Sequence, residues 1–426
     1  MPSGNSAVGT IDIGTLIRGT LLAAVFLLLW ISLRPFPDLS EQAEISASGN
    51  LPTQIVYSTL FLLVAAWCLS HEPERLLLLV RPILIATLAW FALCVITSWE
   101  PGLSARRLAF ALITIGLAGM VLLLPKNIRQ FSEVLATVVL VVLIVCYLGV
   151  FFAPEFSTHQ ATDFIEPELA GAWRGVFGHK NDAGATMVLF VFIGLFVAGV
   201  RSFVIGGTIV VLAGGFLLCT ASKTSIALLP FVLAVAFLMD SIKRPRTGIA
   251  LALLLLVAFN LLTIGSIYIA PIRALLDATM SDPTFTGRTD IWQFVVSHIM
   301  QRPITGYGFA AFWGTNGLLY GMAADDEWVH TASHAHNGYL DLALTIGIPG
   351  MMMVTLWLIV LPVIDYYRSP QQPDTKALSL LCLRVCLFAA YQSCFESLFM
   401  DVGQLWFFLI TTAFGLRLLA VAPIAR

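Results

Sequence analysis

Polar side chains gather between residues 287 and 341 of a chain that is otherwise almost uniformly apolar. Arg288 lies at the start of this stretch, and a guanidinium suits bidentate contact with a phosphate group. His336 lies near its end, and a neutral imidazole with a pKa of about 6.5 can take a proton from a hydroxyl group. The sequence therefore predicts that Arg288 binds an anion and that His336 acts as a general base.

Neighbouring polar residues are expected to hold these two side chains in place. Asp290 could pair with the guanidinium of Arg288, and Asn337 and Asp341 could orient the imidazole of His336. The alternative for the arginine is an exposed ion pair with Asp290, which would contribute little to stability. We include Asp290 and Asn337 among the residues expected to bind substrate.

A metal site is the alternative for the histidines. His330, His334 and His336 lie within seven residues and follow the acidic residues 325–327. Imidazole and carboxylate ligands suit zinc or manganese, but the spacing matches no compact metal-binding signature. We therefore expect no metal and no cofactor. His336 is favoured as the base because it directly precedes the next apolar run.

A second polar group directly precedes another apolar run. The start of a helix offers unpaired N–H groups and the positive end of the helix dipole, which together favour phosphate. Arg174, His179, Lys180 and Asn181 are therefore predicted to bind a diphosphate or a sugar. The alternative is a capped helix, with Asn181 or Asp182 as the N-cap and Lys180 reaching for lipid headgroups.

The composition predicts an all-α polytopic membrane protein. Of its 426 residues, 58% are hydrophobic and 11% are charged, whereas soluble domains average about 25% charged residues. Twelve apolar runs approach the roughly 20 residues that a spanning helix needs, and they form a single integral membrane domain, residues 1–426. The predicted spans are 17–35, 54–70, 79–97, 105–124, 132–153, 181–200, 202–220, 224–242, 247–270, 337–364, 376–396 and 402–420.

The distribution of basic residues predicts the orientation. With the N-terminus in the cytoplasm, the inner segments hold thirteen of the 23 Lys and Arg residues, as the positive-inside rule favours. Both termini are then cytoplasmic. Two long connections, 154–180 and 271–336, face outward, and the larger one lies between spans 9 and 10.

Nine basic residues nevertheless fall on the predicted outer side, which suggests an anionic ligand there. They are Arg34, Arg106, Arg107, Arg174, Lys180, Lys223, Arg273, Arg288 and Arg302. Glu396 closes a predicted span that also contains Arg384. Ionisable groups at membrane depth usually have partners, so these two residues either line a cavity or pair with each other.

These motifs, in this order, resemble the O-antigen ligase and O-antigen polymerase superfamily, most closely its exopolysaccharide-polymerase branch. The resemblance rests on residues 173–184, 221–225, 287–292, 302–313 and 336–350. It implies a GT-C-like, inverting, metal-independent glycosyltransferase whose donor is an undecaprenyl-diphosphate-linked glycan. It also implies that the loop arginine, Arg288, binds the diphosphate and that His336 assists the acceptor hydroxyl.

The resemblance implies a bacterial inner-membrane protein with its active loop in the periplasm. Its expected partners are the lipid-linked donor, a glycan or lipid-linked acceptor, membrane lipids and other polysaccharide export proteins, but no nucleic acid. We expect a polymerase that joins exopolysaccharide repeat units. The alternative is a ligase that moves a finished glycan onto lipid A core or a protein. A transporter is less expected, because the sequence shows no clear internal repeat.

Overall fold

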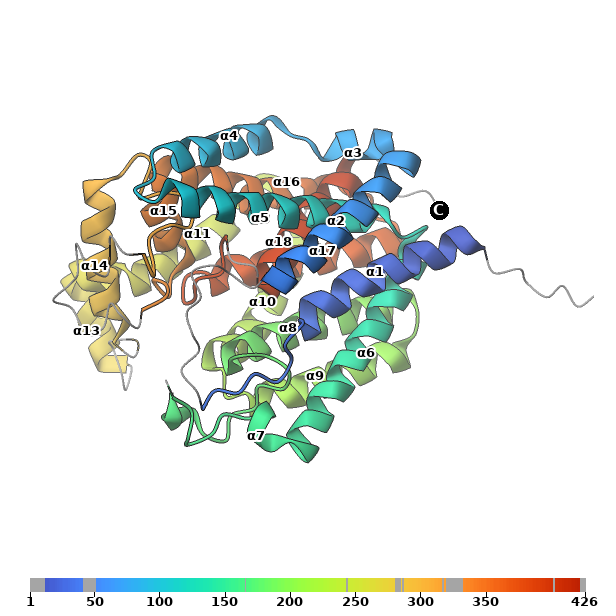
Figure 1. Ribbon diagram of the computed structural model, residues 1–426, viewed down its shortest axis with the longest axis horizontal. Coiled ribbons are helices and arrows are strands. Elements are labelled where there is room, and N and C mark those ends of the chain that lie inside the picture. The colour runs from blue at the N-terminus through green and yellow to red at the C-terminus, as the bar shows by residue number, and fades with distance from the viewer. Residues whose placement is uncertain are drawn as a thin grey trace, which may run out of the picture.

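A computed structural model describes residues 12–40, 51–164, 166–242, 244–279, 285, 287–315, 318, 332–400 and 403–421 (Figure 1). These residues form helices and one isolated antiparallel bridge, between Thr158 and Trp173. In the first half of the chain the α-helices are α1 (Ile13–Ile31), α2 (Leu51–His71), α3 (Pro73–Leu79), α4 (Pro82–Ile96), α5 (Pro101–Met120), α6 (Ile128–Phe152), α7 (Pro154–Ser157), α8 (Lys180–Val200) and α9 (Phe203–Cys219). In the second half they are α10 (Lys223–Ser241), α11 (Pro245–Thr263), α12 (Gly265–Tyr268), α13 (Ala270–Thr279), α14 (Arg288–Gln301), α15 (Gly338–Thr355), α16 (Leu361–Arg368), α17 (Pro373–Gln392) and α18 (Gln404–Val421).

Each of the twelve predicted apolar runs coincides with one helix of the structure or with consecutive helices. Nine helices in the described ranges are long and apolar enough to cross a membrane. The number rises to ten if α3 and α4, which meet at 71°, form one broken span. The polytopic helical fold is therefore confirmed, whereas the count of twelve spans and their orientation stay predictions. The helix α9 has only 17 residues, which explains part of the difference.

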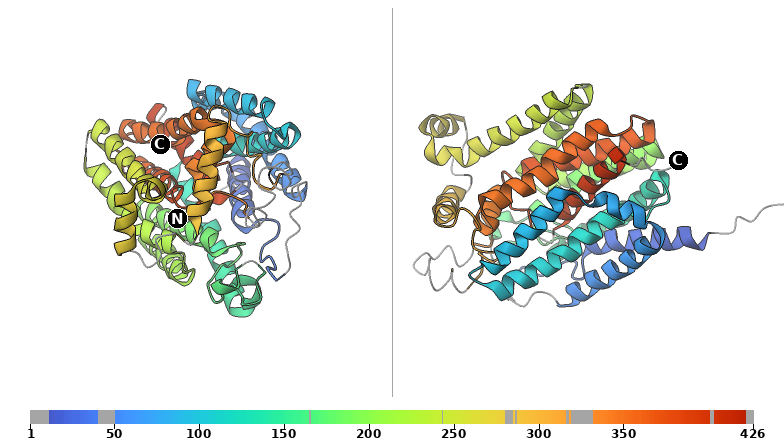
Figure 2. Two further views of the ribbon diagram at one scale, coloured as in Figure 1. Left: turned by 90° about the vertical axis from the view of Figure 1, so that its left-hand side faces the viewer. Right: turned by 90° about the horizontal axis from the view of Figure 1, so that it is seen from above.

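The core of the bundle lies around α8, α17 and α18. The helix α17 packs against α8, α10 and α18, and the apolar windows of α8 and α18 are the most enclosed of the candidate spans. Figure 2 shows that α13 and α14 lie across one end of this bundle, roughly perpendicular to the long helices. We call this the α14 end. It corresponds to the predicted outer face.

The sequence of residues 289–300 predicts a short amphipathic helix, and α14 confirms it with one more residue at each end. Gly287 precedes it in the left-handed conformation, with φ of 78°, which suits a residue without Cβ. One face of α14 buries Trp292, Val295 and Ile299 in a small apolar cluster with the following loop. This packing fixes Arg288, the first residue of the helix.

The helix α15 is broken at Gly347, where φ is 73° and ψ is 170°. The break leaves backbone carbonyls without a partner inside the helix, which is costly at membrane depth. The loop after α14 supplies partners, since Tyr307 N donates to Leu344 O and Gly308 N donates to Thr345 O, both at 3.0 Å. The glycines at 306 and 308 predict a turn over residues 306–311. The structure confirms this turn, which ties the loop to α15.

Replacing Gly347 by alanine is expected to destabilise the protein by more than about 3 kcal/mol. A Cβ at this position would lie 1.8 Å from the carbonyl oxygen of Ile304 and would require a left-handed φ, which alone costs about 1–3 kcal/mol. Gly207→Ala is the matched control, because its Cβ would meet no atom within 4 Å. Thermal unfolding in detergent should show a large loss for Gly347→Ala only; equal melting temperatures would contradict the assignment.

Candidate functional site

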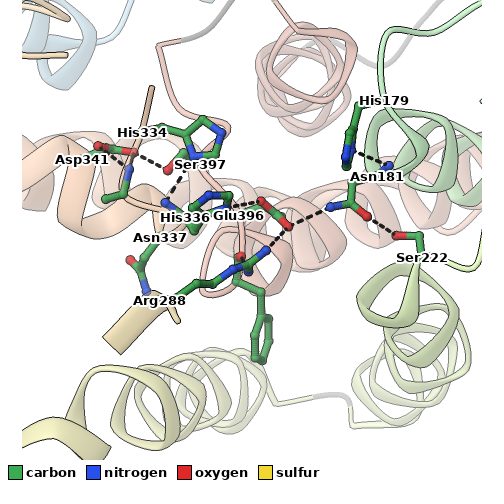
Figure 3. Close-up of polar contacts among 12 residues, drawn as sticks. His179, Asn181, Ser222, Arg288, His334, His336, Asn337, Asp341, Glu396 and Ser397 are labelled. Carbon is green, nitrogen blue, oxygen red and sulfur yellow. Dashed lines mark hydrogen bonds and ion pairs between the residues drawn. The ribbon is translucent and has the colours of Figure 1, made fainter. Parts of the chain in front are cut away.

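Glu396 is the residue on which the predicted site residues converge. It lies in the turn after α17, at the α14 end, and its carboxylate contacts three of them (Figure 3). Arg288 Nη2 and Asn181 Nδ2 donate to Oε1 at 2.8 and 3.1 Å, and His336 Nδ1 lies 3.2 Å from Oε2. Three separate elements, the first turns of α8 and α14 and the segment before α15, therefore meet at one carboxylate.

The environment of Glu396 keeps its carboxylate ionised. Burial raises the pKa of this group, but the hydrogen bond with His336 and the charge of Arg288 outweigh burial and lower the pKa to about 2. The side chain is 16% exposed, so the pair with Arg288 lies at the boundary of the bundle. The ionised carboxylate is therefore an acceptor on both oxygens.

Arg288 is held by Glu396 and by the backbone. Besides the ion pair, its Nη1 donates to the carbonyl oxygen of Phe395. Its side chain is 19% exposed, and its remaining N–H groups make no hydrogen bond within the described ranges, so they can contact an anionic ligand. Asp290 is exposed and forms no bond with Arg288 among these residues. The prediction that Asp290 holds the guanidinium is therefore wrong.

His336 has one ring nitrogen engaged and one available. In the neutral ring, Nδ1–H donates a hydrogen bond to the ionised carboxylate of Glu396, and the lone pair is then on Nε2. No described residue hydrogen-bonds Nε2, and the side chain is 32% exposed. The backbone has a φ of 50°, a left-handed conformation that non-glycine residues adopt at a cost and often at functional sites. The geometry suits a general base.

Asn337 has a structural role that the sequence analysis did not predict. It is fully buried and caps α15, because its Oδ1 accepts from Tyr339 N and Leu340 N, both at 3.1 Å. Its Nδ2 donates to Cys394 O at 3.0 Å, on the segment that carries Glu396. A side chain so enclosed cannot contact a glycan, so the predicted binding role does not fit.

Asp341 holds the segment before His336. Its carboxylate accepts from Trp313 Nε1 at 2.8 Å, from Ala335 N at 3.1 Å and from the hydroxyl of Ser397. Neither Asp341 nor Asn337 hydrogen-bonds the imidazole, and the prediction that they orient it directly is wrong. They act on the backbone at either side of it, while Glu396 orients the ring.

Arg174 does not fit the predicted binding role. Its side chain is 0% exposed, and its guanidinium donates to Phe177 O at 3.1 Å and Pro37 O at 2.7 Å. A buried guanidinium that already donates to two carbonyls would have to leave the protein interior to reach a ligand. Arg174 therefore stabilises the connection 154–180.

The start of α8 is capped by a different residue from the two that the sequence suggests. The N-cap is His179, whose Nδ1 accepts from Asn181 N at 3.1 Å, so neither Asn181 nor Asp182 is the cap. Asn181 instead extends the site, because its Oδ1 accepts from the hydroxyl of Ser222 at 3.1 Å. Lys180 Nζ donates to the carbonyl oxygen of Ala221 at 3.4 Å. The first turns of α8 and α10 thus lie together.

The sequence places Glu396 at the end of a predicted span but does not assign it to the site. The charged and polar groups near Arg384 are Asp240 and Tyr366, and Glu396 pairs with Arg288 instead, so the predicted alternative of an Arg384–Glu396 pair is wrong. Glu396 could have been identified from its position, because it is an acidic residue at the predicted outer end of a span, where the predicted outer cations also lie.

The metal alternative rested partly on residues outside the described ranges. His330 and the acidic residues 325–327 lie there. Among the residues that are described, no group of three or more His, Cys, Asp and Glu side chains could hold a metal ion. The rings of His334 and His336 lie 4.1 Å apart.

Comparisons with known proteins agree with the motifs. Residues 208–355 match the family model described as O-antigen ligase. The chain is 27% identical over 195 residues to the exopolysaccharide production protein ExoQ of Rhizobium meliloti, a match covering 43% of this chain and 45% of ExoQ. It is 28% identical over 110 residues to a Rickettsia conorii protein named as a candidate polysaccharide ligase, covering 24% of this chain and 25% of that protein.

The matched segments span less than half the length of either relative. The segment that matches the family model includes α10, α11, α14 and the whole of α15; Arg288 begins α14 and His336 lies just before α15. The chain, a polytopic helical protein, is therefore similar to the O-antigen ligase family over residues 208–355 and to a protein of exopolysaccharide production over part of its length.

Proposed function

We propose that the chain is a membrane glycosyltransferase that takes a glycan from undecaprenyl diphosphate at the outer face of the bacterial inner membrane and polymerises the repeat units of an exopolysaccharide. The observation that carries the proposal is the carboxylate of Glu396 shared by Arg288 and His336. This arrangement leaves N–H groups of the guanidinium and Nε2 of the imidazole available side by side. An anion-binding group and a base are therefore adjacent.

The reaction follows from these two groups. The acceptor hydroxyl oxygen attacks the anomeric carbon from the face opposite the diphosphate, and the bond between that carbon and the diphosphate oxygen breaks. The hydroxyl proton passes to Nε2 of His336, and the ionised Glu396 stabilises the imidazolium that forms. The diphosphate leaves with the bonding electron pair, and Arg288 stabilises its growing charge. This direct displacement inverts the anomeric centre.

Other cations extend the proposed anion site. Lys180 begins α8 and Lys223 begins α10, and these helix starts are linked through Asn181 and Ser222. Cations of the chain would neutralise the diphosphate in a poorly hydrated site, where fixed charges act strongly. Because the guanidinium of Arg288 is already paired with Glu396, the two lysines would supply the net positive charge that attracts the donor.

A ligase that transfers a finished glycan to lipid A core or a protein is the second candidate. The name of the Rickettsia conorii relative favours it. Polymerase and ligase share the donor site and the base in this proposal, and they differ in the acceptor. Other polysaccharide export proteins are proposed partners in either case.

Complementation of a strain deleted for this gene tests the proposal. Wild type, His336→Ala and the control Asp277→Asn are compared at equal membrane abundance, with glycan size read on a gel. We expect the His336 variant to accumulate single lipid-linked repeat units while the control makes long chains, because Asp277 is exposed on α13 and is not part of the proposed site. Long lipid-linked chains that reach no acceptor would indicate a ligase. Normal glycan from His336→Ala would contradict the proposed site.

A further inference from the structure

The first two amides of α8 are capped by imidazoles. Helices usually begin with a Ser, Thr, Asp or Asn side chain that accepts from the free N–H groups. Here Lys180 N donates to Nε2 of His159 at 3.2 Å, and Asn181 N donates to Nδ1 of His179 at 3.1 Å. The two rings lie 5.2 Å apart, nearly edge to face.

Each ring uses its other nitrogen on a carboxylate. His159 Nδ1 lies 2.9 Å from Asp163, and His179 Nε2 lies 2.9 Å from Glu166. Both carboxylates come from the connection between α7 and α8, as does His159. The pairs therefore form a continuous chain from carboxylate through imidazole to the backbone of α8.

The protonation state of both rings follows from these contacts. A backbone N–H group can only donate, so the ring nitrogen that accepts from it must hold a lone pair. An imidazolium has no such lone pair, so both rings are neutral in this arrangement. The single proton then lies on Nδ1 of His159 and on Nε2 of His179, where each carboxylate accepts it. The two histidines are opposite tautomers.

We propose that His159 and His179 are positioning residues that set the first turn of α8 and thereby hold Asn181 against Glu396. The side chain of Asn181 donates to Glu396 at 3.1 Å, directly from the capped turn. His159 is 2% exposed and cannot contact substrate. For His179, capping replaces the substrate-binding role predicted from the sequence.

Burial and charge act differently on the two rings. Burial lowers the pKa of His159, and the hydrogen bond to Asp163 opposes this shift only in part. For His179 burial also lowers the pKa, but Glu166 outweighs it and the net shift is upward. The amide of Asn181 requires the lone pair of His179 all the same, so the cap holds only while this ring is neutral.

Amide side chains can imitate one ring nitrogen at a time, which gives a test with matched controls. The carbonyl oxygen of asparagine lies near the position of Nδ1, and that of glutamine lies near the position of Nε2. His159→Gln and His179→Asn therefore keep the acceptor, whereas His159→Asn and His179→Gln lose it. We expect the two variants that keep the acceptor to transfer glycan at a rate within about 3-fold of wild type. The two variants that lose it should transfer at least about 10-fold more slowly, mainly through a lower kcat.

The same four variants separate positioning from a role in folding alone. The proposal is overturned if all four variants transfer glycan equally. It is also overturned if the same amide, glutamine or asparagine, is the better replacement at both positions. The capping role of the two histidines rests on the proposed function only where glycan transfer is the quantity measured. If His336→Ala transfers normally while the melting temperatures of the four variants still follow the opposite preferences, the proposed function fails and the caps stand.

Nuclear magnetic resonance gives a readout that needs no activity. In protein labelled with ¹⁵N-histidine and reconstituted in lipid at neutral pH, difference spectra against His159→Gln and His179→Asn assign the two rings. We expect His159 to carry its proton on Nδ1 and His179 on Nε2. The reverse tautomer at either position, or an imidazolium at neutral pH, would overturn the proposal.

Discussion

Replacing Glu396 by glutamine is expected to reduce glycan transfer by roughly 10²–10⁴-fold, the range associated with general acid–base catalysis. Glutamine has a similar shape but no charge, so the imidazolium formed at His336 loses its counter-ion and Arg288 loses its partner. A partly buried guanidinium left without its carboxylate is also destabilising. The measurement is the transfer rate in proteoliposomes supplied with the lipid-linked substrate.

Asp277→Asn is the control for the loss of one negative charge at the α14 end, because Asp277 is exposed on α13 and is not part of the proposed site. We expect its transfer rate to stay near that of wild type. A Glu396→Gln rate within about 3-fold of the control would mean that the carboxylate does not assist the base, since proton-transfer groups contribute roughly 10²-fold or more.

The stability of the protein should depend on pH through Glu396. Its pKa in the folded protein is about 2, below its ordinary value of 4.5. Its contribution to the free energy of unfolding is therefore present above pH 4.5 and is lost as the pH falls towards 2. As the pH falls through this window, the melting temperature of wild type should decrease more steeply than that of Glu396→Gln. Parallel pH profiles would contradict the assigned ionisation.

Replacing Arg288 by lysine is expected to reduce transfer by roughly 10²-fold or more, although the charge is kept. The guanidinium donates to the carbonyl of Phe395 and to Glu396 from two different nitrogens, and its remaining N–H groups face the proposed diphosphate. A single ammonium group cannot reproduce this planar arrangement. The expected loss follows from geometry and not from net charge.

Arg302→Lys is the matched control for that experiment. Arg302 lies at the other end of α14, and its guanidinium lies 5.1 Å from the ring of Tyr307 instead of at Glu396. We expect it to keep most of its activity. Near-normal turnover of Arg288→Lys in the same reconstituted assay would remove Arg288 from the mechanism.

The sequence predicted the helices well because their determinants are local. Apolar length located each spanning helix, and the bounds of α14 were predicted within one residue at each end. The glycines at 306 and 308 marked a turn, and both have positive φ in the structure. These features depend on residues close together in the chain, where periodicity and backbone preference can be read directly.

The partners of the site residues could not be predicted in the same way. Glu396 lies 108 residues from Arg288 in the sequence, and only the tertiary fold brings the turn after α17 to the starts of α8 and α14. Arg174 illustrates the opposite error. Its predicted outer position suggested a ligand, but its guanidinium donates a hydrogen bond to the carbonyl oxygen of Pro37, 137 residues away.

The break in α15 has a consequence for amide hydrogen exchange. The amide protons of Tyr307 and Gly308 lie in a loop at the predicted outer face, yet they are bonded to carbonyls of α15. Trp90 Nε1 likewise donates to Ile346 O at 2.8 Å. Releasing the loop would expose several carbonyls in an apolar environment at once, so these loop amides should exchange as slowly as those of a spanning helix, in one cooperative opening with α15.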